Sequence, residues 1–359
     1  MRLISKRKIK ALAERIVQNG AEAALFVNDE PMQDMNIPYL SGFFGMLDGA
    51  LIFDADSKLT LITTGLDYER AVEQSNVDEI LKTTSSKPIE EIAKRVLKGR
   101  KKIGVVKSSL TLDICKRLGI PISRFVDIGS AMREERAVKE ESEIEAIKKS
   151  ASICNGGIRF LQDSIKKGVK ENEVSSELEK ELKALGSERS PFDIIVTSGP
   201  KSSFIHPYPS AGSKRLDNGL GIVDFGAVHK GYSTDVTVPF IVGTPSKKES
   251  SIIKAVLYSY DLILKRIREG ATTRSMNFAY EKSVKSVGFQ IKHSLGHGIG
   301  LEIHDAPTLC FNQKLKQNMV LAIEPGIYVK GVGGCRLEND VIVNKGGCTV
   351  ITKSKLIST

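Results

Sequence analysis

The stretch that constrains the fold most is His-Ser-Leu-Gly-His-Gly-Ile-Gly-Leu-Glu-Ile-His-Asp, residues 293–305, which holds three of the protein's five histidines. Its glycines, Gly296, Gly298 and Gly300, argue against a regular helix because glycine loses much backbone entropy there. Glycine instead permits tight turns and a close approach of neighbouring groups. A single histidine is usually an ordinary core or surface residue, but three on one glycine-broken turn indicate a functional site.

Upstream of this stretch, two aspartates interrupt apolar runs that are typical of strands. Asp224 lies in Gly-Ile-Val-Asp-Phe-Gly, and Asp235 lies in Tyr-Ser-Thr-Asp-Val. A hairpin that turns between His229 and Lys230 would place the two aspartates opposite each other, with Cβ atoms roughly 5 Å apart. The sequence therefore predicts a pair of facing carboxylates.

Downstream, the pattern repeats with two glutamates. Glu324 lies in Ala-Ile-Glu-Pro-Gly and Glu338 in Cys-Arg-Leu-Glu, and a hairpin centred on Gly331 places them opposite each other. Equivalent acids lie about a hundred residues apart, as do Gly168 and Gly270, which each separate two predicted helices. This spacing predicts two structurally related halves, each a helix pair followed by a β-hairpin.

Four acids on half-buried strands destabilise a protein unless they are neutralised, paired with cations or bound to metal. Arg336 can serve one of them, but no other cation lies near them in sequence. Two divalent cations would balance four carboxylates, and His297 adds a neutral fifth ligand. Oxygen ligands with one imidazole suit Mn²⁺, Co²⁺ or Fe²⁺ better than a thiolate zinc site does. The predicted metal ligands are Asp224, Asp235, His297, Glu324 and Glu338; a surface aspartate beside a turn is the alternative for any one of them.

Two metals about 3.5–4 Å apart activate water and polarise a carbonyl, so metal-assisted hydrolysis is the predicted reaction class. His293 and His304 share the glycine-rich stretch with His297 and are candidates for proton transfer or transition-state hydrogen bonds. His206 follows a Ser-Gly-Pro turn in a loop between predicted strands, where substrate contacts are common.

The composition describes a soluble globular protein, with 359 residues, 41% hydrophobic and 27% charged. No apolar run approaches the roughly 20 residues of a membrane span, and the basic start lacks the apolar core of a signal peptide. A cytoplasmic location is therefore expected. The five cysteines are scattered without a CxxC pair, which indicates neither a disulfide framework nor a zinc ribbon.

The net charge of +10 raises the alternative of nucleic-acid binding. The basic residues are spread along the chain, and the densest runs, 6–8 and 100–102, are short and not interleaved with aromatics. A solvated surface is the better interpretation, and a nucleic-acid partner is not expected.

Periodicity divides the chain into two predicted domains. Residues 1–131 are predicted to form a small α/β domain with a mixed sheet, and residues 132–359 a domain in which helix pairs alternate with strands. The expected helices cover 5–19, 89–97, 110–118, 142–165, 173–185, 250–267 and 275–287. The expected strands cover 23–27, 50–53, 59–63, 103–106, 192–197, 219–227, 232–242, 319–329 and 335–343.

These motifs resemble the pita-bread metallopeptidase family, specifically its Xaa-Pro peptidases, prolidase and aminopeptidase P. The resemblance spans the chain, including the linker at 136–144, and the five predicted ligands stand where that family holds two metal ions. It implies an α/β creatinase-like N-terminal domain followed by an α+β pita-bread catalytic domain with a pseudo-twofold internal repeat.

The resemblance also implies roles for individual residues. Glu324 matches the residue implicated as acid/base beside its metal role. His293 and His304 match contacts to the substrate and its developing charge. His206 matches the histidine of the Ser-Gly loop, and Arg336 the arginine two residues before the last glutamate. Many relatives differ at Lys201, Ile205 and Val238, which bears on substrate detail rather than on hydrolysis.

The expected function is hydrolysis of the Xaa-Pro bond in short proline-containing peptides by a homodimer. A dipeptidase is favoured over an aminopeptidase P, with Mn²⁺ or Co²⁺ as the metals and Fe²⁺ or Zn²⁺ as alternatives. Methionine aminopeptidase lacks an N-terminal domain of this size, and metal-free creatine hydrolysis is disfavoured by the intact ligands. A catalytically silent member that binds nucleic acid or protein through its basic surface is the alternative from another class.

Overall fold

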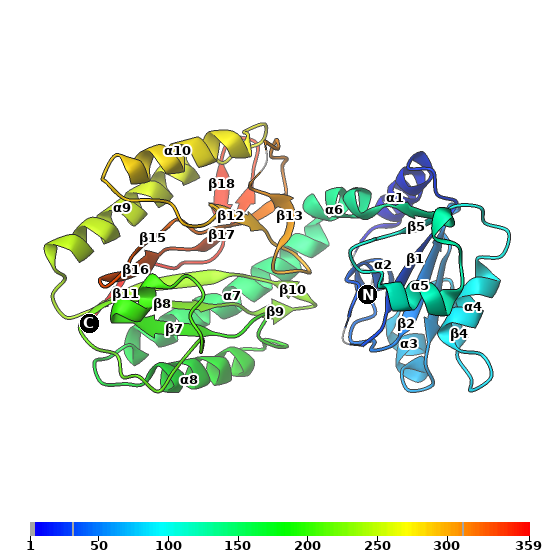
Figure 1. The fold of residues 1–359 in the computed structure, drawn as a ribbon, viewed down its shortest axis with the longest axis horizontal. Coiled ribbons are helices and arrows are strands. Elements are labelled where there is room, and N and C mark those ends of the chain that lie inside the picture. The colour runs from blue at the N-terminus through cyan, green and yellow to red at the C-terminus, as the bar shows by residue number, and fades with distance from the viewer. Residues whose placement is uncertain (1–3, 31, 311) are drawn as a thin grey trace. The chain divides into compact units, whose positions relative to one another are not determined.

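The computed structural model describes residues 4–30, 32–310 and 312–359. The chain separates into two units, Met1–Glu135 and Arg136–Thr359 (Figure 1). Helix α6 (Gly129–Ala137) runs across this division. The division therefore lies a few residues beyond the expected boundary between residues 131 and 132, which falls inside the helix.

The first unit is built on one mixed six-stranded sheet with the order β4-β3-β2-β1-β5-β6. Strand β1 is central, antiparallel to β2 and parallel to β5. Buried aliphatic residues on these strands pack against α4 and α5, so the expected α/β domain with a mixed sheet is present. The elements are α1 (Lys6–Gln18), β1 (Ala23–Asn28), α2 (Asn36–Ser41), β2 (Gly49–Asp54), β3 (Leu59–Thr63), α3 (Tyr68–Gln74), β4 (Glu79–Lys82), α4 (Ile89–Val96), β5 (Ile103–Val105), α5 (Leu112–Leu118), η1 (Ile122–Arg124) and β6 (Phe125–Asp127).

The second unit has a helix pair that packs against a four-stranded sheet of order β19-β11-β8-β7, in which β19 (Ile357–Ser358) runs parallel to β11 and the other neighbours are antiparallel. Apolar residues of both helices and of β7, β8 and β11 form one continuous core. The elements of this half are α7 (Glu141–Ser164), α8 (Glu171–Ala184), β7 (Ile195–Ser198), η2 (Gly199–Ser203), β8 (Gly219–Phe225), β9 (Val228–His229), β10 (Tyr232–Ser233) and β11 (Val236–Val242).

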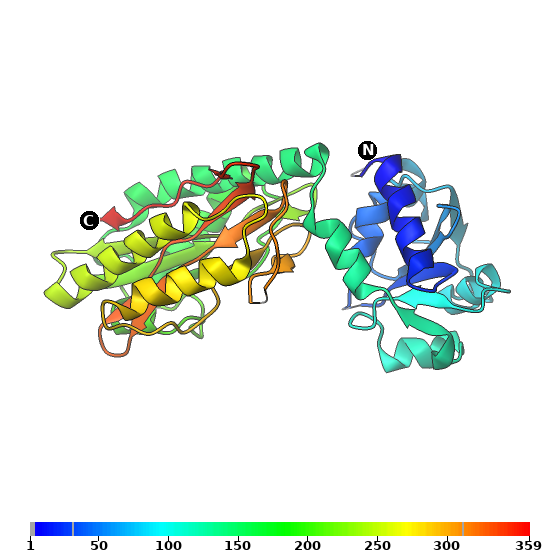
Figure 2. The ribbon, with the colours of Figure 1, turned by 90° about the horizontal axis from the view of Figure 1, so that it is seen from above.

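The second half of this unit repeats the order with its own core. Helices α9 and α10 pack against β14 to β17, and Figure 2 shows the yellow-green α9 and the yellow α10 running along the strands. The five-stranded sheet has the order β13-β12-β14-β17-β18. The elements are α9 (Lys247–Leu264), α10 (Thr273–Lys285), β12 (Gly296–Gly298), β13 (Asp305–Thr308), β14 (Val320–Ile323), β15 (Gly326–Val329), β16 (Gly333–Arg336), β17 (Asn339–Val343), β18 (Cys348–Val350) and β19 (Ile357–Ser358). The predicted repeat of a helix pair followed by strands is confirmed.

The predicted register of the first hairpin is wrong. Asp224 lies opposite Thr237 rather than Asp235, because the chain turns at Lys230 and Gly231, one residue later than expected. Both turn residues have positive φ, 49° and 75°, which is the conformation that two-residue hairpins favour. Asp235 lies in the gap between β10 and β11, so the predicted continuous strand 232–242 is interrupted there.

The predicted register of the second hairpin is confirmed. Gly326 pairs with Arg336 on one side, and Ile323 pairs with Asn339 on the other, so Glu324 and Glu338 fall opposite each other between two short ladders. Each predicted long strand is broken at its glutamate. In both halves, an acidic side chain therefore lies where a strand is interrupted and the backbone is free of the ladder.

No helix among the described residues combines the length and the hydropathy that crossing a membrane requires.

Candidate metal centre

His297 lies in the short strand β12, not on the turn that its glycines suggest. Gly296 adopts φ 150°, and a Cβ there would lie 2.0 Å from the Ala322 carbonyl oxygen. Only glycine therefore allows β12 to pair with β14 at this point. A bulge between His297 and Gly298 follows, and such irregularities often re-aim a side chain at a site.

Three predicted ligands converge closely. Asp235, His297 and Glu338 each bring one ligand atom within 4.8 Å of the others, and all three residues are buried. The His297 Nε2 atom lies 3.5 Å from Asp235 Oδ2. These residues come from both halves of the second unit, so the group forms where the two halves meet.

Asp224 and Glu324 belong to the same electrostatic cluster. The charges of Asp224 and Glu324 both raise the pKa of Asp235, after burial as the main cause. Burial also raises the pKa of Glu324 to about 7, against the opposing charges of Arg336 and His297. The structure therefore brings all five predicted ligands into one region.

The buried arginine satisfies only part of this cluster. Arg336 is 2% exposed, and its guanidinium donates to Asp224 Oδ2, to the Tyr328 hydroxyl at 2.8 Å and to Thr237 Oγ1 at 2.8 Å. Thr237 in turn donates to Glu338 at 2.6 Å. Arg336 thus orients two of the candidate ligands without neutralising all four acids.

Buried oxygens remain that the protein itself does not pair. Within the described part of the chain, no group donates a hydrogen bond to Asp224 Oδ1 or Asp235 Oδ1. Burial and the neighbouring acids raise the pKa of Glu338 as well. Unpaired buried carboxylate oxygens are costly, and binding of divalent cations removes that cost. The donor set of four carboxylates and one imidazole fits such cations.

His293 is held beside the cluster as a neutral ring. Its Nε2 atom lies 3.0 Å from the Tyr328 hydroxyl, and its Nδ1 atom lies 2.7 Å from the Ser294 carbonyl and 3.5 Å from Glu324 Oε2. Burial and the charge of Arg336 lower the pKa of His293 to about 4. The ring is therefore uncharged at neutral pH.

His304 packs on the candidate ligand His297. The two rings meet edge to face with centroids 4.3 Å apart. Burial lowers the pKa of His304, and so do the charges of His297 and His206. The exposed His206 therefore lies close enough to act electrostatically on His304, and it acts likewise on His293. The three predicted substrate histidines therefore lie near one another.

The loop that carries His206 is anchored by one buried carboxylate. Glu171 accepts hydrogen bonds from the backbone N–H groups of Ser198 and Gly212, both at 3.2 Å, at the two ends of the loop. Its side chain also pairs with Lys201 at 2.8 Å and is fully buried. Lys201 thus contributes to an ion pair at the base of the loop.

Sequence reasoning missed three residues of this network, Asp340, Tyr328 and Thr237. Asp340 is fully buried, its Oδ2 atom accepts the Asp235 N–H at 3.1 Å, and burial raises its pKa to about 8. In the sequence, Asp340 follows Glu338 at the two-residue spacing of one strand face, although the structure interrupts the strand at Glu338. That alternation was the available signal for Asp340. No comparable pattern pointed to Tyr328 or Thr237.

Comparison with known families gives two matches along the chain. Residues 8–138 match the Creatinase/Prolidase N-terminal domain, and residues 145–345 match Metallopeptidase family M24. The chain is 30% identical to the Xaa-Pro dipeptidase of Pyrococcus horikoshii, with 98% of each chain covered.

Solved structures give the same picture. An Xaa-Pro dipeptidase from Bacillus anthracis superposes with a TM-score of 0.89 at 31% identity, covering 98% of this chain and 99% of that one. An X-Pro aminopeptidase from Thermotoga maritima reaches a TM-score of 0.86 at 28% identity, covering 96% of this chain and 100% of that one. The similarity therefore includes both kinds of proline-directed peptidase.

Proposed function

The chain belongs to metallopeptidase family M24, and from this premise we propose that it is an Xaa-Pro dipeptidase that requires divalent metal. The single observation that supports this most strongly is the buried cluster of acids around His297, whose unpaired oxygens call for cations. The relatives from Pyrococcus horikoshii and Bacillus anthracis, which are 30% and 31% identical over nearly the whole chain, are described as Xaa-Pro dipeptidases, and this supports the substrate class.

We propose that the metal ligands are the five predicted residues and that they hold two ions, with Mn²⁺ or Co²⁺ preferred over Fe²⁺ or Zn²⁺. The oxygen-rich donor set supports the harder ions. When bound, such a pair of cations activates a water molecule and polarises the scissile carbonyl. The ligands would be Asp224, Asp235, His297, Glu324 and Glu338.

The surrounding residues would bind and orient the substrate. His293, His304 and His206 would contact the substrate. The single N–H of the neutral His293 ring donates to the Ser294 carbonyl, so it donates to a substrate oxygen only after that contact is released. Arg336 fixes Asp224. Glu324 is the proposed acid/base. An Xaa-Pro bond has no N–H, so recognition depends on such side chains rather than on strand-like pairing.

The decisive experiment uses chelated protein supplied separately with Mn²⁺, Co²⁺, Fe²⁺ and Zn²⁺. We expect hydrolysis of an Xaa-Pro dipeptide only after metal is added, with Mn²⁺ or Co²⁺ most effective. Activity that survives exhaustive chelation would contradict the metal requirement. Absence of peptidase activity together with salt-sensitive RNA binding would instead support the silent binding protein.

The similarity to an X-Pro aminopeptidase keeps a second peptidase function in view. An aminopeptidase would cleave an Xaa-Pro-Yaa tripeptide faster than the Xaa-Pro dipeptide, whereas a dipeptidase requires the free proline carboxylate. The ratio of kcat/KM for the two peptides decides between them, and a clear preference for the tripeptide would overturn the dipeptidase proposal.

We also propose that the enzyme is a cytoplasmic homodimer. All five cysteines are free, which is consistent with a reducing compartment. Sedimentation of the metal-loaded protein tests the dimer, and a monomer at assay concentration would contradict it.

A further inference from the structure

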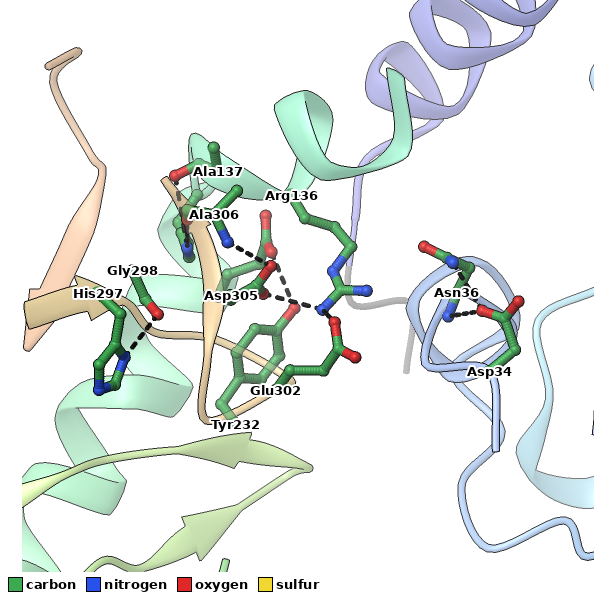
Figure 3. A network of polar contacts seen from close by, with 12 residues as sticks. Asp34, Asn36, Arg136, Ala137, Tyr232, His297, Gly298, Glu302, Asp305 and Ala306 are labelled. Atoms are coloured by element: carbon green, nitrogen blue, oxygen red, sulfur yellow. Dashed lines mark hydrogen bonds and ion pairs between the residues drawn. The ribbon is translucent and has the colours of Figure 1, made fainter. Parts of the chain in front are cut away.

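A buried arginine outside the metal cluster holds the segment that carries His304. Arg136 donates to Asp305 Oδ2 at 3.0 Å and pairs with Glu302 at 2.5 Å (Figure 3). The side chains of Arg136 and Asp305 are only 5% and 2% exposed, whereas Glu302 is half exposed. Burial alone would lower the pKa of Arg136, but these two acids raise it, so the guanidinium stays charged.

Asp305 is locked on its other side as well. Its Oδ1 atom accepts the Ala306 N–H at 2.8 Å, and its backbone pairs with Gly298 next to His297. A Cβ on Gly300 would lie 2.5 Å from Asp305 Oδ2, so glycine leaves the room that this carboxylate occupies. The Asp305 carboxylate therefore lies inside the loop that the pairing of Gly298 with Asp305 closes, next to Gly300.

His304 immediately precedes Asp305 and packs edge to face on His297. The same segment is also tied to strand β10, because the Ser233 N–H donates to the Gly300 carbonyl at 2.7 Å. The cost of burying a charged pair is recovered only when its geometry is well satisfied, which restricts the backbone around it. Fixing Asp305 thus fixes the backbone from which the His304 ring projects.

We propose that Arg136 is a positioning residue that acts through Asp305 to hold His304 against His297. The effect of Arg136 on catalysis rests on the proposed peptidase function, because it requires that His304 contacts the substrate. The orientation of the His304 ring is a property of the protein itself and is measured independently of activity.

The kinetic test is a double-mutant cycle between Arg136 and His304 with an Xaa-Pro dipeptide and saturating Mn²⁺. We expect Arg136→Met to lower kcat/KM by about tenfold to a hundredfold in the natural background, because small misplacements of a substrate contact are costly. In the His304→Ala background the same change should cost less than about twofold, since the group it positions is gone. An equal loss in both backgrounds would mean a general structural role and would overturn the proposal.

The matched control is Glu302→Gln, which removes the half-exposed partner of the same guanidinium. We expect at most about a twofold effect, because exposed ion pairs contribute little. Arg136→Lys keeps the charge and should recover part of the loss. If Arg136→Met does not fold, Asp305→Asn preserves the side-chain shape, breaks the ion pair and completes the same cycle.

The second readout is NMR of protein labelled with ¹³C in the histidine rings. With five histidines in the chain, comparison with His304→Ala assigns the His304 signal. We expect Arg136→Met to shift this signal because the ring loses its packing against His297, while the His206 signal stays in place. An unmoved His304 signal would overturn the proposal even if the peptidase assay failed for other reasons.

Discussion

At the scale of single residues, the candidate centre contains buried acids that lower the stability of the metal-free protein. Asp224, Asp235, Glu324 and Glu338 repel one another in a buried region, and Arg336 compensates only part of their charge. Such arrangements persist at functional sites because bound cations repay the cost. This arrangement allows opposite effects on stability and activity to be predicted for one substitution.

Glu324→Gln should lower activity at saturating Mn²⁺ by at least about a hundredfold, because the charge of a proposed metal ligand and the proposed acid/base are lost. The same change should raise the melting temperature of the metal-free protein at pH 8, because it removes one member of the repelling cluster. Thermal melts with chelator and peptidase assays with Mn²⁺ measure the two effects.

Glu302→Gln is the control for that substitution, since it removes an exposed acid outside the cluster. It should leave the metal-free melting temperature nearly unchanged. A metal-free Glu324→Gln protein that melts below the natural protein would show that the cluster is already neutralised by other means.

Much of the site could be predicted at the residue scale because the ligand types and their spacing are local properties of the sequence. The five candidate ligands were selected from strand patterns and one glycine-rich stretch alone. Asp340 was missed because a single acid in an apolar strand resembles a surface position unless its neighbours are placed. Tyr328 contributes through its hydroxyl, and aliphatic and aromatic patterning treats tyrosine as core.

At the scale of secondary-structure elements, the turn residues determined which of the two predicted hairpin registers was confirmed. The second hairpin has one glycine, Gly331, at its tip, and its register followed from that centre. The first hairpin turns at Lys230–Gly231, where a lysine adopts positive φ, and centring the turn one residue earlier moved the predicted partner of Asp224. The interruptions of the strands at Asp235, Glu324 and Glu338 were not predicted, because hydrophobic periodicity alone does not detect a local loss of strand pairing.

Gly296→Ala should disrupt the pairing of β12 with β14, since its Cβ would overlap the Ala322 carbonyl. We expect a larger loss of stability than for Gly288→Ala, which also has positive φ but nothing within 4 Å, and which should cost about 1 kcal/mol. Denaturant unfolding of the metal-loaded proteins measures both.

The Mn²⁺ affinities of the two variants, measured by isothermal titration, distinguish backbone strain alone from a displacement of His297. Gly296→Ala should weaken metal binding while Gly288→Ala should not. Equal stability losses and equal Mn²⁺ affinities for the two variants would contradict the close-approach role of Gly296.

Glu171→Gln should loosen the loop that carries His206, because the buried carboxylate ties both ends of the loop and pairs with Lys201. We expect faster amide hydrogen exchange across 199–212 and a fall in kcat/KM of about tenfold. Glu173→Gln, at a half-exposed position of the same helix, is the matched control. Unchanged exchange in 199–212 would contradict the clamp.

At the scale of the whole molecule, two-domain organisation and a repeated catalytic unit could be predicted because they depend on element order and on the roughly hundred-residue spacing. The first unit was predicted less completely: its short elements α2, α3, β4 and β6 lack a long periodic pattern. The exact boundary between the two units could not be predicted from the sequence either. It lies inside helix α6, where the composition does not change.

The stability of the metal-free protein should fall as pH rises from about 7 to 9. Burial raises the pKa of Glu324 from 4.5 to about 7 and that of Asp340 from 3.8 to about 8, so the folded state binds more protons than the unfolded state in this range. Stability therefore decreases with pH as these groups ionise. His293, whose pKa is lowered, has the opposite effect only at lower pH.

Thermal melts of the chelated protein at pH 7 and pH 9 test this sign, and saturating Mn²⁺ should remove most of the difference by pairing the carboxylates. The metal-bound protein at each pH is the control. A chelated protein that melts higher at pH 9 than at pH 7 would contradict the buried acid cluster.

Each half of the second unit has its own apolar core, yet the candidate ligands are divided, with two acids from one half and the remaining three groups from the other. A cut in the connection at 243–246 would produce two fragments that are still joined by the pairing of β11 with β19, by the hydrogen bond from Gly334 to Ser202 and by the candidate ligands. Added Mn²⁺ should strengthen their reassembly into an active heterodimer, and chelator should weaken it. The metal ions would then help to hold the two halves of the second unit together, in addition to their role in hydrolysis.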